Sequence, residues 1–208
     1  MLADRLCQRL VGPLIGLCIA TGSVSFAAAN EQSDAARQVV DSLHNQLFEV
    51  AGDDSLNFDE RVDKLTPVVS ASYDFQYISR FILRRSWSGL EPGQQSLFVS
   101  AFERLSVANY ASRFTELDEQ SLVVTDVSPA ARERVQVDAR LQLPDDELDL
   151  VLSYTLTEGK GGDWAIINLI ADGVSDLALR RAEYSRVLKD KGFDGLLVHI
   201  DGQIADLK

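Results

Sequence analysis

The clearest pattern of apolar and polar residues lies between residues 134 and 170 and predicts a β-sheet. Apolar and polar side chains alternate through 134–143 and again through 148–157, and a third apolar segment, 164–170, follows a glycine-rich break. Alternation with a period of two places one set of side chains on each face of an extended strand. With a first strand over 122–127, the sequence predicts a four-stranded antiparallel meander with one aliphatic face.

Helical spacing of apolar residues predicts helices before this sheet. A first helix is expected over 31–50, and Asn57 with Glu60 has the spacing of a capping box for the next helix. Thr66-Pro67 has the composition of a helix start. We therefore expect the second helix to end near residue 65 and the chain to bend before a new helical turn.

Further helices are expected on both sides of the strands. Asp74 can cap a helix, a longer helix runs over 92–117, and after the sheet Ser175 caps a helix that ends before Gly192 and is followed by a last helix. The order predicts an α+β domain, with helices surrounding a curved, mostly antiparallel sheet of about four strands. The inward residues expected on the helix after Asp74 are Phe75, Ile78, Phe81 and Ile82.

The aliphatic face of the predicted sheet carries almost no side chain that could do chemistry. It is a wall for something apolar, either the protein's own helices or a bound lipid. The candidate residues for a lipid cavity come from this face and from the apolar faces of two helices, and the same side chains equally suit a filled core. They are Phe75, Ile78, Phe98, Phe102, Leu105, Val135, Val137, Leu150, Leu152, Tyr154, Trp164 and Ile166.

The first 29 residues are organised as a secretory signal. Arg5 and Arg9 provide positive charge, residues 10–19 form an apolar stretch, and three alanines at 27–29 offer a cleavage site. The apolar stretch is short for a membrane span, although an uncleaved anchor stays an alternative. We therefore expect export to the periplasm with cleavage of residues 1–29.

Removal of the signal leaves one expected domain over 30–208 that has no cysteine and a large acidic excess. Cys7 and Cys18 both lie within the signal, which rules out disulfides and thiolate metal ligands in the rest of the chain. The net charge is −12 for the full chain and −13 without the signal, which contains two arginines and one aspartate. Such a charge repels phosphate backbones and excludes nucleic-acid binding.

Candidate catalytic chemistry is sparse. His44 and His199 stand singly on amphipathic helices, without the neighbours that a metal site needs, so a surface or core-edge role is expected for both. Gly173-Val-Ser175 resembles half of a nucleophile elbow, but it lacks the second glycine and suits a helix cap better. We expect no enzyme activity, no metal and no cofactor.

Two groups of arginines stand out on this acidic chain. They are ordinary solvated helix faces or, alternatively, a surface that binds carboxylate or phosphate groups through paired hydrogen bonds. The first group is Arg80, Arg84 and Arg85, and the second is Arg180, Arg181 and Arg186.

Several short segments, taken in order, form a recognisable series. They are Tyr-Asp-Phe at 73–75 with Ile-Ser-Arg at 78–80 and Trp87, Gln-Gln through Tyr at 94–110, Val-Gln-Val at 135–137, Asp-Trp-Ala-Ile at 163–166, Asp-Gly-Val-Ser at 172–175 and Lys-Gly-Phe-Asp-Gly-Leu-Leu at 191–197. Together these segments resemble the MlaC family of periplasmic phospholipid-binding proteins, also called toluene-tolerance proteins. The resemblance covers nearly the whole chain after the signal, and the segment 172–184 is most similar to the hopanoid-associated branch, HpnM.

This resemblance implies a monomeric lipid carrier with no catalytic residues. The acyl chains of a phospholipid, or a hopanoid-like lipid, would lie between the sheet and the helices as cargo. The implied partners are an inner-membrane ABC transporter complex and an outer-membrane lipoprotein complex, which together serve outer-membrane lipid asymmetry. Two alternatives stay open: an adaptor of a membrane transporter that carries no lipid, and a small exported enzyme that acts on an apolar substrate.

Overall fold

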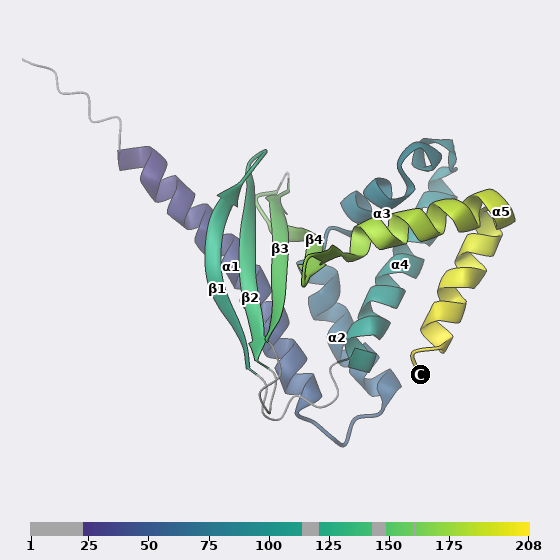
Figure 1. The fold of residues 1–208 in the computed structure, drawn as a ribbon, viewed down its shortest axis with the longest axis horizontal. Helices are drawn as coiled ribbons and strands as arrows, with labels where there is room; N and C mark the ends of the chain where they lie inside the picture. Colours follow the sequence, from purple (N-terminus) through teal and green to yellow (C-terminus); the bar gives the residue numbers. More distant parts are fainter. Residues whose placement is uncertain (1–22, 114–120, 143–148, 160) are drawn as a thin grey trace, which may run out of the picture.

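The protein forms helices packed against one face of an antiparallel sheet, as the sequence predicts for an α+β domain (Figure 1). The computed structural model describes residues 23–113, 121–142, 149–159 and 161–208. The elements in chain order are α1 (Ser23–Ala51), α2 (Phe58–Ser72), α3 (Phe75–Leu83), the 3₁₀ helix η1 (Arg84–Gly89), α4 (Pro92–Arg113), β1 (Ser121–Ala130), β2 (Arg134–Gln142), β3 (Leu150–Glu158), β4 (Trp164–Ala171), β5 (Val174–Ser175) and α5 (Asp176–Ala205).

The sheet has the order β1-β2-β3-β4-β5, with antiparallel neighbours throughout. The four expected strands are present, and the two-residue β5 adds a short fifth. Val137 lies opposite Tyr154, and Ala139 lies opposite Leu152, so these four buried side chains share one face. Burial alternates along β2 and β3, which confirms the predicted division into a buried face and an outer face.

Helix α1 covers part of the buried face of the sheet. It contacts β1 to β4, and Val40, Leu43 and Leu47 are at most 1% exposed. The helix begins at Ser23, earlier than the expected residue 31. Helices α2, α4, α3 and α5 then pack on one another beside the sheet (Figure 1). No helix in the described ranges is long and apolar enough to cross a membrane.

The second helix is continuous, so the expected bend at Thr66-Pro67 is wrong. The capping box at Asn57 and Glu60 is present, with the Asn57 side chain accepting from the Glu60 N–H. The helix then passes through Pro67, and the Thr66 hydroxyl donates to the Val62 carbonyl at 2.7 Å. Proline at this point removes one backbone hydrogen bond, but its φ is helical. The helix is held on both sides of the proline because it packs against α1 and α4.

Helix α3 is capped as expected, with the Tyr77 N–H donating to the Asp74 carboxylate at 2.8 Å. Phe75, Ile78 and Ile82 are buried, but Phe81 is 39% exposed and does not point inward as predicted. The buried face of α3 is too narrow to include it. Instead the Arg181 guanidinium of α5 lies 5.4 Å from the centre of the Phe81 ring.

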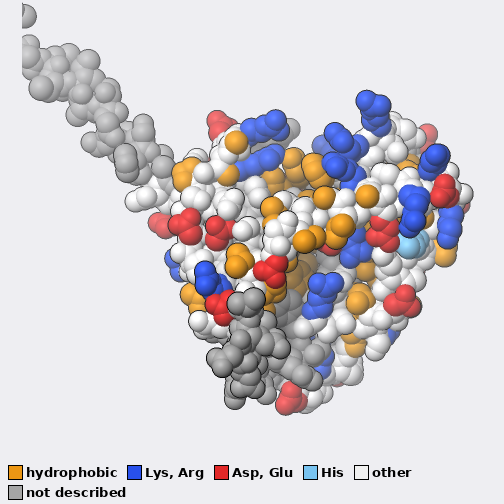
Figure 2. All heavy atoms as spheres, viewed as in Figure 1, with side chains coloured by type: hydrophobic (Ala, Val, Ile, Leu, Met, Phe, Trp, Pro, Cys, Tyr) orange, Lys and Arg blue, Asp and Glu red, His pale blue; other side chains and the backbone are white. Residues whose placement is uncertain are grey.

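Helix α5 is interrupted at Gly192, whose φ of 71° and ψ of −173° are not helical. This confirms the expected stop, and Figure 1 shows the sharp bend in the yellow part of the chain. Ser175 caps the first half by accepting from the Ala178 N–H. Helix α4 ends at Arg113, and the expected end near residue 117 lies outside the described residues. Basic side chains gather along the upper edge of the view in Figure 2, above the region of α3 and α5 in Figure 1.

Candidate functional site: an apolar cavity between the sheet and the helices

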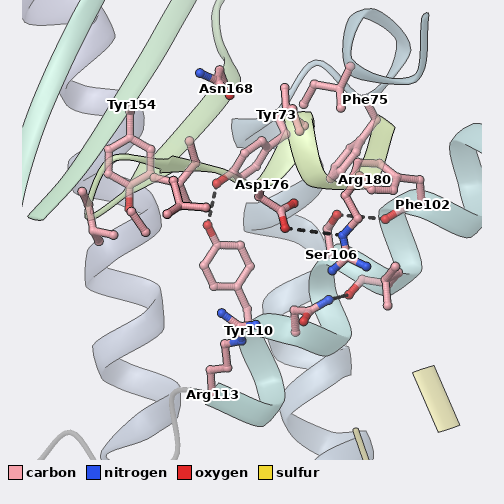
Figure 3. Close-up of a pocket in the computed structure, with 18 of the residues that line it drawn as sticks. Tyr73, Phe75, Phe102, Ser106, Tyr110, Arg113, Tyr154, Asn168, Asp176 and Arg180 are labelled. Atoms are coloured by element: carbon pink, nitrogen blue, oxygen red, sulfur yellow. Dashed lines mark hydrogen bonds and ion pairs between the residues drawn. The ribbon is translucent and has the colours of Figure 1, made fainter. Parts of the chain in front are cut away.

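A cavity of about 420 Å³ lies between the buried face of the sheet and helices α3, α4 and α5 (Figure 3). This volume falls in the lower half of the range typical of small-molecule sites. The lining residues are Tyr73, Phe75, Ile78, Phe102, Leu105, Ser106, Asn109, Tyr110, Arg113, Leu141, Leu150, Leu152, Tyr154, Asn168, Leu169, Ala171, Val174, Asp176, Leu177 and Arg180.

The sheet supplies one wall of the cavity through alternating side chains. Leu150, Leu152 and Tyr154 lie on one face of β3 because they are two residues apart. Leu141 of β2 lies opposite Leu150, and Leu169 of β4 lies opposite Tyr154. The alternation seen in the sequence therefore produces a continuous, mainly aliphatic wall.

Helix α4 supplies a second wall that changes from apolar to polar along its length. The lining residues Phe102, Leu105, Asn109 and Arg113 recur three or four residues apart, which places them on one side of the helix. The apolar members come first, and the polar members lie toward the end of the helix. The cavity therefore has an apolar interior and a more polar end.

Two tyrosine hydroxyls meet across the cavity wall. The hydroxyls of Tyr73 and Tyr110 are hydrogen-bonded, and Figure 3 shows them pointing at each other. Burial raises the pKa of Tyr110 to about 12 and raises the pKa of Tyr73 well above its ordinary value. Both hydroxyls therefore stay protonated and neutral at physiological pH. The hydrogen bond satisfies two hydroxyl groups that line the cavity.

A third tyrosine is bonded to the first helix. The Tyr154 hydroxyl lies 3.0 Å from Nε2 of His44, and both side chains are buried. Burial lowers the pKa of His44 to about 4, with the nearby Asp41 carboxylate acting in the opposite direction. The imidazole is therefore neutral at physiological pH, and we assign it a structural role. The sequence analysis expected a surface or core-edge histidine, and its packing against Tyr154 was missed.

Two charged groups that α5 contributes to the cavity are paired with each other. Asp176 and Arg180 are one turn apart on α5, and Nε of Arg180 lies 3.4 Å from the Asp176 carboxylate (Figure 3). Arg180 also donates to the Gln203 side chain at 3.3 Å. Gln203 belongs to the second half of α5, so this network joins the two halves across Gly192.

Seven of the twelve residues expected to bind lipid line the cavity, and five do not. Phe98 stacks on Phe102 and meets Tyr184 edge-on within the helical core, with ring centres 6.3 and 6.1 Å apart. Val135, Val137, Trp164 and Ile166 are buried beyond the cavity. The seven that line it are Phe75, Ile78, Phe102, Leu105, Leu150, Leu152 and Tyr154.

The lining residues that were not predicted from the sequence are mainly the polar ones and those from β4 and α5. Tyr110 and Arg113 continue the helical spacing of Phe102 and Leu105, so that spacing could have identified them. Leu169 and Ala171 fall outside the alternation of Trp164 and Ile166, because an irregularity in the pairing of β3 with β4 shifts the register between them. No comparable signal marks Tyr73, which reaches the cavity because an isolated bridge to Ile166 holds its backbone beside β4.

The site offers binding surface but little reactive chemistry. Among the described residues, no group of three or more His, Cys, Asp and Glu side chains could hold a metal ion. The Ser175 hydroxyl donates to Asn168 and accepts from the Ala178 N–H, which confirms its role as a helix cap. What the arrangement can do is enclose an apolar chain and leave a polar group near α5 and the end of α4.

A solved structure has the same fold. It is the phospholipid-binding protein from Ralstonia solanacearum, in complex with a phospholipid, and it aligns with a TM-score of 0.70 at 19% sequence identity. The alignment covers 85% of this chain and 98% of that chain. A search of curated protein sequences gives no match.

The family comparison covers most of the sequence. The family described as MlaC protein matches residues 37–201, which include all of α2 to α4, all of the sheet, about half of α1 and most of α5. The match thus contains every residue that lines the cavity. The chain belongs to the MlaC family.

Proposed function

We propose that this protein is a periplasmic carrier that holds a phospholipid by its acyl chains in the cavity between the sheet and α3 to α5. The observation that supports this most directly is the apolar cavity of about 420 Å³ in a chain of the MlaC family. The Ralstonia protein of the same fold was solved with a phospholipid bound. The proposal includes export through a signal over residues 1–29 and a single lipid-binding domain over 30–208.

The energetics suit a carrier. Burying acyl chain from water is worth about 0.8 kcal/mol per methylene, so a lipid would hardly ever leave the cavity into water. A lipid in a bilayer is already buried, and its transfer into a similarly apolar cavity is close to neutral. Direction can therefore be set by partners, which we propose to be an inner-membrane ABC transporter and an outer-membrane complex.

The size of the cavity bears on how the lipid is held. A two-chain lipid is large for a cavity in the lower half of the usual range. We infer that part of the lipid extends out of the cavity or that α4 and α5 move away from the sheet when it binds. The headgroup would lie at the polar end, near Asn109, Arg113 and Arg180.

The test is native mass spectrometry of the exported chain purified without detergent, followed by extraction of the bound lipid. We expect about one phospholipid per chain. Leu150→Asp places a charge on the cavity wall, whereas Val151→Asp places it on the outer face of the same strand, where Val151 is 43% exposed. Lipid should be lost from the Leu150 variant and kept by the Val151 variant.

Other results would favour the alternatives. A hopanoid in the extract would change the class of lipid that is carried, and the protein would still be a lipid carrier. A folded chain that is empty and takes no lipid from liposomes would favour an adaptor. Release of a chemically altered lipid would favour an enzyme.

A further inference from the structure

The outer side of α3, η1 and the start of α5 is basic, although the chain as a whole is acidic. We call Arg80, Arg84, Arg85 and Arg181 the arginine surface. Arg181 is about a hundred residues from the others in sequence, and it joins them because α5 packs against α3. Figure 2 shows Lys and Arg side chains gathered at the upper edge over this region.

The four arginines are not neutralised by neighbouring acidic side chains. Within the described ranges, none of them forms a salt bridge, whereas Arg37, Arg104, Arg140 and Arg180 each pair with an aspartate. The chain has 32 acidic and 20 basic residues, so carboxylates are abundant. Arginines that have no carboxylate partner therefore keep their charge available for an external anion.

Aromatic rings hold two of these guanidinium groups in place. Arg181 lies 5.4 Å from the centre of the Phe81 ring, and Arg80 lies 6.0 Å from the centre of the Trp87 ring. Such stacking orders an exposed guanidinium and reduces the entropy lost when it binds a partner. It also gives a partner to Phe81, a large apolar ring that is 39% exposed.

The backbone at the centre of this surface is strained. Arg84 has a φ of 48°, which is uncommon for a residue with a long side chain, and it joins α3 to η1. Strain of this kind persists only where the surrounding structure imposes it, and it is frequent at functional surfaces. The turn presents Arg84 and Arg85 side by side and exposed.

We propose that the arginine surface docks an acidic segment of a protein that exchanges lipid with the cavity. Carboxylates of Asp and Glu match the paired N–H groups of arginine. An anionic bilayer is a poorer partner than a short acidic segment, because its negative surface is extended and opposes the whole chain, of net charge −12, whereas a short segment can contact the arginine surface alone. The identity of the partner as a lipid donor or acceptor rests on the proposed function, but the acidic contact does not.

The position of the arginine surface links docking to the cavity. Ile78 of α3 lines the cavity while Arg80 and Phe81 face outward, and Arg180 of α5 lines it beside Arg181. A partner bound to the outer side therefore contacts the same two helices that form part of the cavity wall. A small movement of either helix would change the opening available to the lipid.

The test compares two triple variants that change the net charge equally. Arg84→Glu, Arg85→Glu and Arg181→Glu alter the arginine surface, whereas Arg37→Glu, Arg104→Glu and Arg140→Glu alter ion-paired arginines elsewhere. The probe is a fluorescent peptide of alternating Glu and Asp, measured by anisotropy at low ionic strength. We expect the surface variant to bind roughly tenfold more weakly than the control variant. Replacing the same three arginines by lysine should give intermediate binding, because the charge stays and the paired hydrogen bonds are lost.

Three results would overturn the proposal. These are a wild-type chain that does not bind the peptide, an equal loss in both triple variants, and binding to phosphatidylglycerol vesicles but not to the peptide. Lipid content, measured by mass spectrometry of each variant, separates the two proposals. The variant of the arginine surface should keep its lipid. If the wild type and all variants contain no lipid, the carrier function is contradicted, but the peptide-binding result still tests the docking proposal.

Discussion

His44 and Tyr154 form a buried polar pair between α1 and the cavity wall, and they make stability depend on pH. The pKa of His44 is about 4 in the folded protein, against an ordinary value of 6.5, because burial disfavours the charged ring. The folded state therefore holds a neutral imidazole where the unfolded state becomes protonated. The stability that this provides is complete above pH 6.5 and is lost as the pH falls toward 4.

We predict that replacing His44 by glutamine makes the protein less sensitive to acid. Over this pH range the wild-type free energy of unfolding should fall by about 3 kcal/mol more than that of the variant. Urea unfolding at several pH values measures the difference. Parallel curves for the two proteins would show that His44 does not titrate in this way.

The Tyr73–Tyr110 pair should contribute to stability and not to lipid retention. Changing either tyrosine to phenylalanine leaves one buried hydroxyl without this partner and should cost about 1–2 kcal/mol. The double variant should lose less stability than the two single variants added together, because the same hydrogen bond is lost in all three proteins. Lipid content, measured by extraction, should stay unchanged, because the wall remains apolar. Loss of lipid from the double variant would instead assign the hydroxyls to the cargo.

At the scale of elements, Gly192 divides α5 and allows its second half to fold back. The φ of 71° at Gly192 favours glycine, and a Cβ there would meet no atom within 4 Å. Gly192→Ala should therefore lower stability by about 1 kcal/mol through backbone strain alone. Gly202 is the matched control, since it lies inside the helix without a positive φ and has equal space. Gly202→Ala should raise stability by about 0.5–1 kcal/mol, and equal effects in thermal unfolding would contradict this account.

Local patterns predicted most element boundaries because the physics of those boundaries is local. Asn57, Asp74 and Ser175 cap helices through side chains that reach backbone N–H groups three residues away. The bend at Pro67 was predicted from the same kind of signal and is wrong. Packing of α2 against α1 and α4 is a long-range effect, and it outweighs the one hydrogen bond that proline removes.

At the scale of the whole molecule, bound lipid should stabilise the fold by mass action. A ligand that binds only the folded chain at a hundred times its Kd adds about 2.7 kcal/mol. Delipidated wild-type protein should therefore unfold at a lower temperature than the lipid-loaded form, as measured by calorimetry. Leu150→Asp should show little difference between the two preparations, and Val151→Asp should behave as wild type. A wild-type chain with the same Tm in both forms would argue against lipid in the cavity.

The arrangement of helices over the sheet decides which residues face the cavity. Val137 and Tyr154 are opposite each other on the buried face, yet only Tyr154 lines the cavity. Both positions satisfy the same alternation and burial. The difference arises because α1 and its neighbours pack directly on part of the buried face, whereas the cavity separates α4 and α5 from the remaining part of that face.

The sequence by itself determined the strands, their buried face, the helix caps and the acidic charge, because each depends on residues close together along the chain. Tertiary structure decided what lies over the buried face. It separated the cavity residue Leu150 from the core residue Val135, and it paired Tyr73 with Tyr110. It also brought Arg181 to Arg84 by packing α5 on α3. These outcomes depend on how whole elements meet, and apolar residues in a core and in a cavity wall obey the same local rules.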